Sequence, residues 1–369
     1  MADIALRLEH VSRYFGKVKA VDDLSLDIPS GAFVTLLGPS GCGKSTTLSL
    51  IAGLDRLDHG RILLGDEDIT ATPPNERRMA MVFQNYALYP HMTAFDNIAF
   101  GLKLQHRPRP EIQSRVNGVA EALDIAHLLK RKPGQMSGGQ QQRVALGRAL
   151  VKEPVVFLLD EPFSNLDAGL RTRMRTEVKH LHLKLGTTSV FVTHDQEEAM
   201  TLSDLIAVMR DGKIVQLGTT KEIYRSPRDL YVATFVGKPK MSLVDGAIDQ
   251  SNGHVVFASQ DIRIDLGAPA AIGLRDGAWP NVALGIRAED VRINTNGSAP
   301  NPDRSFGAAV QLLEPIGSDT FVELAAGDAT IVARVAPDAG LKLGQTVQAE
   351  LLPGRIHLFD RERGERIIQ

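Results

Sequence analysis

Short apolar runs alternate with helical patterns over residues 1–235, and this alternation predicts a sheet flanked by helices. Three of the runs are continuous and apolar, as buried strands are, and they cover residues 33–37, 155–159 and 189–193. Two later runs, 205–209 and 214–217, are joined by Asp211-Gly212, which predicts a hairpin. The pattern therefore indicates an α/β domain.

The segments between these strands have helical periodicity. One helical face is predicted from apolar residues that recur every three or four positions, namely Leu170, Met174, Val178, Leu181 and Leu185. A mainly helical insertion is predicted at about 85–152, starting near the aromatic-rich segment 86–90.

The pattern changes after Phe235 to short strands broken by Gly, Asp, Asn and Pro, without a long helical pattern between them. Strands are predicted at 310–313, 320–324, 331–335 and 346–351. This predicts a second, all-β domain at 236–369, a small barrel or sandwich, with a linker near 237–240.

Composition limits the class of protein. The 369 residues suit two or three domains, and 43% hydrophobic with 23% charged residues is ordinary for a soluble globular protein. The net charge of -2 provides no overall basic field, so we expect no nucleic-acid partner.

The sequence shows no signal peptide and no apolar run close to the roughly 18 residues of a membrane span, so another chain must provide any membrane attachment. The one cysteine, Cys42, excludes an intrachain disulfide, and a reducing cytoplasm is the default compartment.

Residues 38–45 read Gly-Pro-Ser-Gly-Cys-Gly-Lys-Ser and lie between a predicted strand and the helical segment 45–52. This is the phosphate-loop pattern in its strand–loop–helix context, in which backbone amides and a helix N-terminus face the phosphates. Lys44 would place its charge between the β- and γ-phosphates, and the Ser45 hydroxyl would ligate Mg²⁺. The predicted nucleotide contacts are Gly38, Pro39, Ser40, Gly41, Cys42, Gly43, Lys44, Ser45 and Thr46. A chance glycine-rich turn is the alternative for the motif alone.

Polar residues after other predicted strands could complete a hydrolysis site. Asp160 suits Mg²⁺, and Glu161 is the candidate general base for water. Gln84 could contact both Mg²⁺ and the water, His194 could bridge the water and the γ-phosphate, and Tyr14 could stack on adenine. Taken singly, each of these residues also fits an ordinary structural role.

The segment 137–143, Ser-Gly-Gly-Gln-Gln-Gln-Arg, resembles the signature sequence of the nucleotide-binding subunits of ABC transporters. Physically it is a second glycine-rich helix N-terminus, hence another end that can bind an anion. Residues 160–167 look like the metal-binding strand of that family and the loop beyond it, while Tyr14, Gln84 and His194 match its aromatic, glutamine and histidine loops. The resemblance covers 1–235 in the order of the family. Met136 departs from it, because a leucine is usual there.

Segments 235–241, 285–290 and 314–318 are similar to the C-terminal domain of sugar-importer ATPases, such as those for maltose, glycerol phosphate and trehalose. The resemblance implies an α/β P-loop ATPase with a helical subdomain, followed by an OB-like regulatory β domain. It implies that ATP hydrolysis with Mg²⁺ powers a bacterial importer of a sugar, glycoside or related polyol. An importer ATPase for an inorganic anion and a soluble ABC ATPase without transport are the alternatives.

The chain has one phosphate loop and one signature segment. The resemblance implies that ATP lies between the phosphate loop of one subunit and the signature of another, so we predict a homodimer with two ATPs. Ser137, Gly139 and Gln140 would then contact the ATP held by the partner.

The resemblance also implies two membrane-spanning permease subunits, a periplasmic solute-binding protein and a peripheral position on the cytoplasmic face of the bacterial inner membrane. The surface around 84–100 would receive a permease helix in a groove formed by Tyr86, Leu88, Tyr89, His91 and Met92, unless these side chains belong to the core. Alkylation of Cys42 by a bulky reagent is expected to block nucleotide binding.

Overall fold

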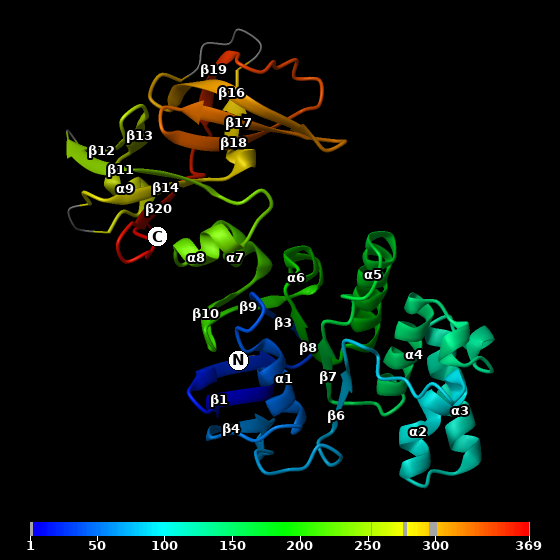
Figure 1. Cartoon of the computed structure of the whole chain (residues 1–369). Coiled ribbons are helices and arrows are strands. Elements are labelled where there is room, and N and C mark those ends of the chain that lie inside the picture. The colour runs from blue at the N-terminus through cyan, green and yellow to red at the C-terminus, as the bar shows by residue number, and fades with distance from the viewer. Residues whose placement is uncertain (1–2, 252, 276–278, 295–300, 369) are drawn as a thin grey trace. The chain divides into compact units, whose positions relative to one another are not determined.

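The computed structural model describes residues 3–251, 253–275, 279–294 and 301–368. Contacts divide the chain into two compact units, Met1–Lys221 and Glu222–Gln369 (Figure 1). The first unit contains both helices and sheets, and the second is built mainly from strands, so the predicted fold class is confirmed.

The central sheet of the first unit has six strands in the order β10-β9-β3-β8-β7-β6. Five of them are parallel, and β10 pairs antiparallel with β9 as the predicted hairpin. The strands are β3 (Phe33–Leu37), β6 (Met79–Val82), β7 (Val156–Asp160), β8 (Thr188–Thr193), β9 (Leu205–Arg210) and β10 (Lys213–Gly218). The strand β3 and the strand β8 are buried along their whole length, which explains their continuous apolar sequence.

A second, antiparallel sheet of the first unit has the order β2-β1-β4-β5. Its strands are β1 (Ile4–Phe15), β2 (Val18–Pro29), β4 (His59–Leu64) and β5 (Glu67–Asp68). Leu6 and Leu26 from this sheet share a core cluster with Leu36 of β3 and Leu48 of α1 (Lys44–Ala52). This shared core holds the start of α1 in place.

Helices α2 (Ala94–Leu104), α3 (Arg109–Ala122) and α4 (Gly138–Leu150) lie within the predicted insertion, together with the 3₁₀ turns η1 (Ala126–Leu128) and η2 (Pro133–Gln135). Helices α5 (Ala168–Leu185) and α6 (Gln196–Leu202) follow β7 and β8. The predicted face of α5 is buried at Met174 and Val178, and Leu170 and Leu181 pack against the same core. Leu185 continues this face by its spacing but is 47% exposed at the end of the helix, next to the left-handed cap Gly186, so the burial of the face stops before its last residue.

The second unit has two five-stranded antiparallel sheets, with the orders β13-β12-β11-β14-β20 and β15-β19-β16-β17-β18. Both contribute to one core, which contains Phe257 and Leu284 from the first sheet and Val322 and Ala349 from the second. The strands are β11 (Ser242–Ser251), β12 (His254–Ala258), β13 (Arg263–Gly267), β14 (Val282–Ile286), β15 (Val291–Ile293), β16 (Ser305–Pro315), β17 (Thr320–Ala326), β18 (Ala329–Val335), β19 (Thr346–Leu351) and β20 (His357–Asp360).

Short helices accompany these strands: α7 (Thr220–Arg225), α8 (Leu230–Phe235), α9 (Pro269–Ile272) and η3 (Ala288–Asp290). Both α7 and α8 lie before residue 236, yet most of α7 and all of α8 fall within the second unit by their contacts. Among the described residues, none of the helices has both the length and the apolar character needed to cross a membrane.

Candidate nucleotide site

The phosphate loop connects the end of β3 to the start of α1, and glycines are required at two of its positions. Gly43 caps α1 with φ +103°, and a Cβ atom there would lie 2.2 Å from the carbonyl oxygen of Ala20. A Cβ atom on Gly38 would lie 2.6 Å from both the Cys42 Sγ and the Met209 carbonyl oxygen. Any larger residue at either glycine would therefore displace the loop from the strands behind it.

Lys44 is the buried cation of this loop, with only 5% of the residue exposed. Its Nζ donates to the carbonyl oxygens of Gly38 and Pro39, both at 2.9 Å, so the side chain curls back under the loop. In the described part of the chain, no carboxylate forms an ion pair with Lys44. Its hydrogen bonds go to carbonyl oxygens and not to a carboxylate, which suits a site that receives an anion.

Cys42 is packed into the core cluster and is 4% exposed. Burial raises the pKa of its thiol, although Lys44, whose Nζ is 3.9 Å from Sγ, acts in the opposite direction. A buried, protonated thiol is a poor nucleophile, so this packing disfavours the alkylation of Cys42 by which we expected nucleotide binding to be blocked.

Two oxygen groups meet where the first turn of α1 faces the end of β7. The hydroxyl of Ser45 donates to Asp160 Oδ1 at 2.9 Å, although the two residues are 115 positions apart. Burial raises the pKa of Asp160, and the neighbouring Glu161 acts in the same direction, whereas the bond from Ser45 lowers it. A carboxylate desolvated in this way gains more from a nearby cation than an exposed one.

The side chains of Glu161 and His194 also meet, with Glu161 Oε2 3.0 Å from His194 Nδ1. Glu161 has the positive φ of +41° and its amide donates to the carbonyl of Val192 in β8, which anchors the residue beside the strand that leads to His194. When Nδ1 carries the proton, it donates to the carboxylate, and Nε2 is then free to accept from another group.

Gln84 follows β6 and is exposed, and its backbone carbonyl accepts from the side-chain amide of Asn165 at 3.0 Å. This bond ties the segment that carries Gln84 to the loop that follows Glu161. The amide side chain of Gln84 has no hydrogen bond among the described residues.

Tyr14 lies on β1, opposite Lys19 on β2, whose Nζ is 5.7 Å from the centre of the tyrosine ring. The next residue along β2, Ala20, is the one that approaches Gly43 of the phosphate loop. The hydroxyl of Tyr14 donates to Asp22 at 3.2 Å. The ring is therefore oriented by its neighbours at the edge of the site.

The segment that begins at Ser137 forms the N-terminus of α4. Ser137 Oγ accepts from the amide of Gln140 at 3.4 Å, and Gln140 Oε1 accepts from the amide of Ser137 at 3.0 Å, which is a capping box. A Cβ atom on Gly139 would lie 2.8 Å from Leu170, so glycine lets α4 approach α5. No hydrogen bond or ion pair within the described chain links Ser137, Gly139 or Gln140 to the phosphate loop.

The surface around 84–100 differs partly from our expectation. Tyr86 is only 6% exposed and belongs to the core, so its assignment to an exposed groove was wrong. Leu88, Tyr89 and Met92 are half-buried, and His91 is exposed. A cavity of about 330 Å³ lies beside this segment, and its lining includes Tyr89, Phe100, Leu104 and Arg148.

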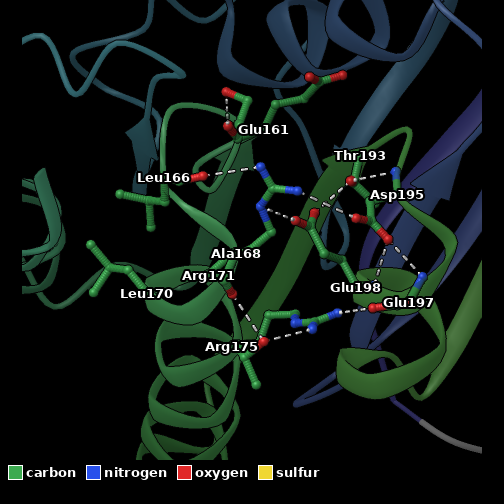
Figure 2. A network of polar contacts seen from close by, with 12 residues as sticks. Glu161, Leu166, Ala168, Leu170, Arg171, Arg175, Thr193, Asp195, Glu197 and Glu198 are labelled. Carbon is green, nitrogen blue, oxygen red and sulfur yellow. Dashed lines mark hydrogen bonds and ion pairs between the residues drawn. The ribbon is translucent and has the colours of Figure 1, made fainter. Parts of the chain in front are cut away.

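Sequence reasoning missed Arg171, a residue of α5 that joins the segments on both sides of the site (Figure 2). Its Nη2 donates to the carbonyl of Leu166 at 3.1 Å, in the loop that follows Glu161. Its Nη1 lies 3.8 Å from Asp195, and its Nε lies 3.9 Å from Glu198. Glu198 is 4% exposed and has a pKa raised by burial, so Arg171 provides much of the positive charge near a desolvated carboxyl group.

The network continues to the residue next to His194. Glu198 accepts from the hydroxyl of Thr193 at 2.6 Å, and Thr193 Oγ1 accepts from the amide of Asp195 at 2.9 Å. A small cavity of about 60 Å³ is lined by Glu161, Arg171 and His194 among others. The spacing of Asp195 and Glu198 by three positions could have indicated two carboxylates on one helical turn. Their partner Arg171 could not have been found in this way, because it is more than 20 positions away in the sequence.

Comparisons with known proteins agree with this geometry. A family model described as ABC transporter matches residues 21–164, and one described as TOBE domain matches 284–359. The chain is 45% identical to the trehalose/maltose import ATP-binding protein MalK of Thermococcus litoralis and 43% identical to the sn-glycerol-3-phosphate import ATP-binding protein UgpC of Salmonella typhimurium, in each case over 98% of this chain and 99% of the relative. It is also 44% identical, with the same coverage, to the uncharacterized ABC transporter ATP-binding protein YurJ of Bacillus subtilis.

Two solved structures resemble the first unit. An ATP-binding cassette of an ABC transporter in its ADP conformation aligns with a TM-score of 0.56 and 29% identity, over 61% of this chain and 96% of that chain. A dimeric post-hydrolysis cassette bound to ADP and Pi aligns with a TM-score of 0.52 and 30% identity, over 58% of this chain and 98% of that chain.

Proposed function

Because the chain belongs to the ATP-binding proteins of ABC transporters, we propose that it hydrolyses ATP to power an importer of a sugar, glycoside or related polyol. Full-length relatives named for the import of trehalose/maltose and of glycerol-3-phosphate support this class of cargo. The cargo class comes from these relatives, whereas the ATPase activity also has support from the geometry of the site.

The observation that carries the proposal is the meeting of three strand ends. Lys44 and Ser45 follow β3, Asp160 and Glu161 end and follow β7, and His194 follows β8. The Ser45–Asp160 bond of 2.9 Å and the Glu161–His194 contact of 3.0 Å bring a phosphate-binding group, a metal-binding group and a proton acceptor to the same edge of the sheet.

In this proposal, the amides of residues 38–46 and the ammonium of Lys44 bind the phosphates of ATP. Glu161 accepts a proton from the attacking water, because its carboxylate lies at the edge of the site beside His194. His194 positions the water and contacts the γ-phosphate through the ring edge that does not face Glu161, and Tyr14 stacks on adenine. The Gln84 amide also contacts the water.

The oxygen groups of Ser45 and Asp160 fit Mg²⁺, because hydroxyl and carboxylate oxygens are its preferred ligands and these two lie 2.9 Å apart. We assign them to Mg²⁺ together with the side-chain carbonyl of Gln84. When bound with ATP, Mg²⁺ supplies charge neutralisation at the β- and γ-phosphates.

We further propose a homodimer in which Ser137, Gly139 and Gln140 of one subunit bind the ATP held by the other. The exposed position of Ser137 at the N-terminus of α4 supports this, because that end has amides and a helix dipole available for a phosphate. The related cassette that is dimeric with ADP and Pi gives further support.

The assembly that we propose includes two membrane-spanning permease subunits and receives cargo from a periplasmic solute-binding protein, with this chain at the cytoplasmic face of the bacterial inner membrane. The cavity of about 330 Å³ lined by Tyr89, Phe100 and Leu104 offers an apolar surface for a permease helix. Relatives named as import proteins support these partners.

Purification of the native protein from membranes tests the proposal. We expect two polytopic membrane proteins to co-purify with it. A Tyr89→Asp substitution in the groove should reduce their recovery, whereas the control Arg173→Ala, at an exposed position on α5, should leave it unchanged. Recovery of the native chain only as a soluble dimer would favour an ABC ATPase without transport. The ligand bound by the co-operating solute-binding protein then distinguishes a sugar importer from an inorganic-anion importer.

A further inference from the structure

The second unit contains a cavity of about 530 Å³ whose lining is rich in cations and shares no residue with the candidate nucleotide site. The cations come from α7, from the segment before η3, from β18 and from both sides of β20, and they are Arg225, Arg287, Arg334, Arg355 and Arg366. The acidic side chains in the lining are Glu289 and Asp290. His357 also lines the cavity, and its pKa is lowered to about 3 by burial and by the nearby Arg366 and Arg287, so it is neutral. The lining therefore has more positive than negative charge.

The deepest of these cations is Arg287, which is 2% exposed. Its Nη1 donates to the carbonyl of Val236 at 2.7 Å, and its Nη2 donates to the carbonyl of Tyr224 at 3.0 Å. Its Nε has no hydrogen-bond partner in the part of the chain that the structure describes. The guanidinium lies 3.9 Å from the centre of the Tyr224 ring. Carbonyls and a ring hold this side chain, but among the described residues no carboxylate lies within ion-pair distance of it.

Arg366 is a second cation without a counter-charge. Its Nε is buried and has no hydrogen-bond partner within the described ranges, and burial lowers the pKa of its guanidinium. In the described part of the chain, neither Arg366 nor Arg225 forms an ion pair. Burying an arginine without a counter-charge costs free energy, and the binding of an anion beside it would offset this cost.

The carboxylates of the cavity do little to neutralise these arginines. Glu289 accepts a hydrogen bond from the hydroxyl of Tyr224 at 2.5 Å. Burial, as the larger cause, and this bond together raise the pKa of Tyr224 to about 12. Asp290 lies 4.0 Å from Arg355, which is a loose contact, and burial raises the pKa of Asp290. Both acidic groups keep oxygens that could accept hydrogen bonds from hydroxyl groups.

We propose that this cavity binds a phosphate group, carried by a small hydroxylated molecule such as a sugar phosphate or present as the free ion. Several guanidinium groups around one space suit the planar, bidentate bonds that arginine forms with phosphate oxygens. The volume of about 530 Å³ is in the range of small-molecule sites. Glu289 and Asp290 would accept bonds from the hydroxyl groups of a sugar phosphate.

The test is calorimetric titration of the full-length protein in saturating ADP with Mg²⁺, which fills the nucleotide site. The probes are glucose 6-phosphate, inorganic phosphate and glucose. The variants are Arg366→Gln and Arg225→Gln, and the matched control is Arg363→Gln, an exposed arginine three positions before Arg366 that does not line the cavity. Arg225 is exposed, so its replacement keeps the test available if Arg366→Gln fails to fold.

We expect a phosphate-bearing probe to bind the wild type and Arg363→Gln equally, and to bind Arg225→Gln and Arg366→Gln about tenfold or more weakly. Glucose should not bind. Glucose 6-phosphate binding more tightly than inorganic phosphate assigns the site to an organic phosphate, and the reverse assigns it to the free ion. The proposal is overturned if neither phosphate probe binds, or if both cavity variants bind like the wild type. These outcomes do not depend on ATP hydrolysis or transport.

Discussion

At the scale of single residues, the candidate site depends on positions where the backbone or a buried charge leaves little choice. Glu161 has φ +41°, a conformation that costs a non-glycine residue about 1 kcal/mol or more. The bond from its amide to Val192 and the contact of its side chain with His194 offset this cost. The strained residue is thus the one for which we propose the chemical step.

The first prediction concerns the carboxylate of Glu161. The Glu161→Gln variant keeps the size of the side chain but cannot accept a proton, so we expect the kcat of ATP hydrolysis to fall by about 10²- to 10⁴-fold. Nucleotide binding should persist, because Lys44 and the loop are unchanged. Steady-state ATPase assays and calorimetric ATP binding measure the two effects. Glu121→Gln, at an exposed position on α3, is the control, and a Glu161→Gln variant with wild-type turnover would contradict the proposed role.

The second prediction concerns Cys42, the one thiol of the chain. Because the thiol is 4% exposed and its pKa is raised by burial, we expect a maleimide to react with the native protein at least about tenfold more slowly than with the unfolded chain. Reaction rates in buffer and in concentrated urea give this ratio. Equal rates in the two conditions would mean that the thiol is accessible in the folded loop.

At the scale of elements, the strands of the central sheet could be predicted because parallel strands buried on both faces are continuous apolar runs. The four-stranded sheet of β1, β2, β4 and β5 was not predicted, although residues 24–28 of β2 alternate between buried and exposed, as half-buried strands do. The pairing of β1 with β4, which brings Leu6 opposite Leu64, is not encoded in any local pattern. The site residues could be located by motif, but their contacts could not. Arg171 contacts a loop on one side and α6 on the other, and no local pattern encodes that pairing.

The third prediction concerns this link between α5 and α6. Arg171→Ala removes the group that joins the loop after Glu161 to Glu198, which supports Thr193 next to His194. We expect the kcat for ATP to fall by about 10-fold or more while KM changes by less than about threefold, because the residue positions other groups without binding ATP itself.

Arg171→Lys should recover part of this activity, and Arg173→Ala, at an exposed position on the same helix, should behave like the wild type. Melting temperatures measured alongside separate a positioning role from simple loss of fold. If Arg171→Ala keeps the wild-type kcat, the link has no part in catalysis.

At the scale of the whole molecule, the two units could be anticipated from the change of pattern after Phe235, but the content of the second unit could not. Its strands were visible in the sequence because they are short runs separated by Gly, Asp, Asn and Pro, which favour turns. The arginine-lined cavity was not, because its lining comes from α7, β18 and the two sides of β20, which lie far apart along the chain. Charged residues that come together only in the folded protein form no motif in the sequence.

The last prediction concerns the stability of this second unit at low pH. The neutral His357 is 5% exposed with a pKa of about 3, whereas an unfolded histidine titrates near 6.5, so below about pH 6.5 the unfolded chain binds the extra proton. Stability therefore rises with pH between these two values and is lost on acidification, by about 1.4 kcal/mol from pH 7.5 to pH 5.5 for this one group.

Urea unfolding followed by the fluorescence of Trp279, the single tryptophan of the chain, measures this loss, because Trp279 packs against the core of the second unit. His357→Leu should remove about 1.4 kcal/mol of the difference between the two pH values, whatever its effect at pH 7.5. His254→Leu replaces an exposed histidine of the same unit that contacts Asp265 at 2.8 Å, and it measures how much of the pH dependence a surface histidine pair contributes. The same pH dependence in His357→Leu and in the wild type would show that His357 titrates in the folded protein as it does in the unfolded chain, and at pH 5.5 the cavity would then hold a further positive charge.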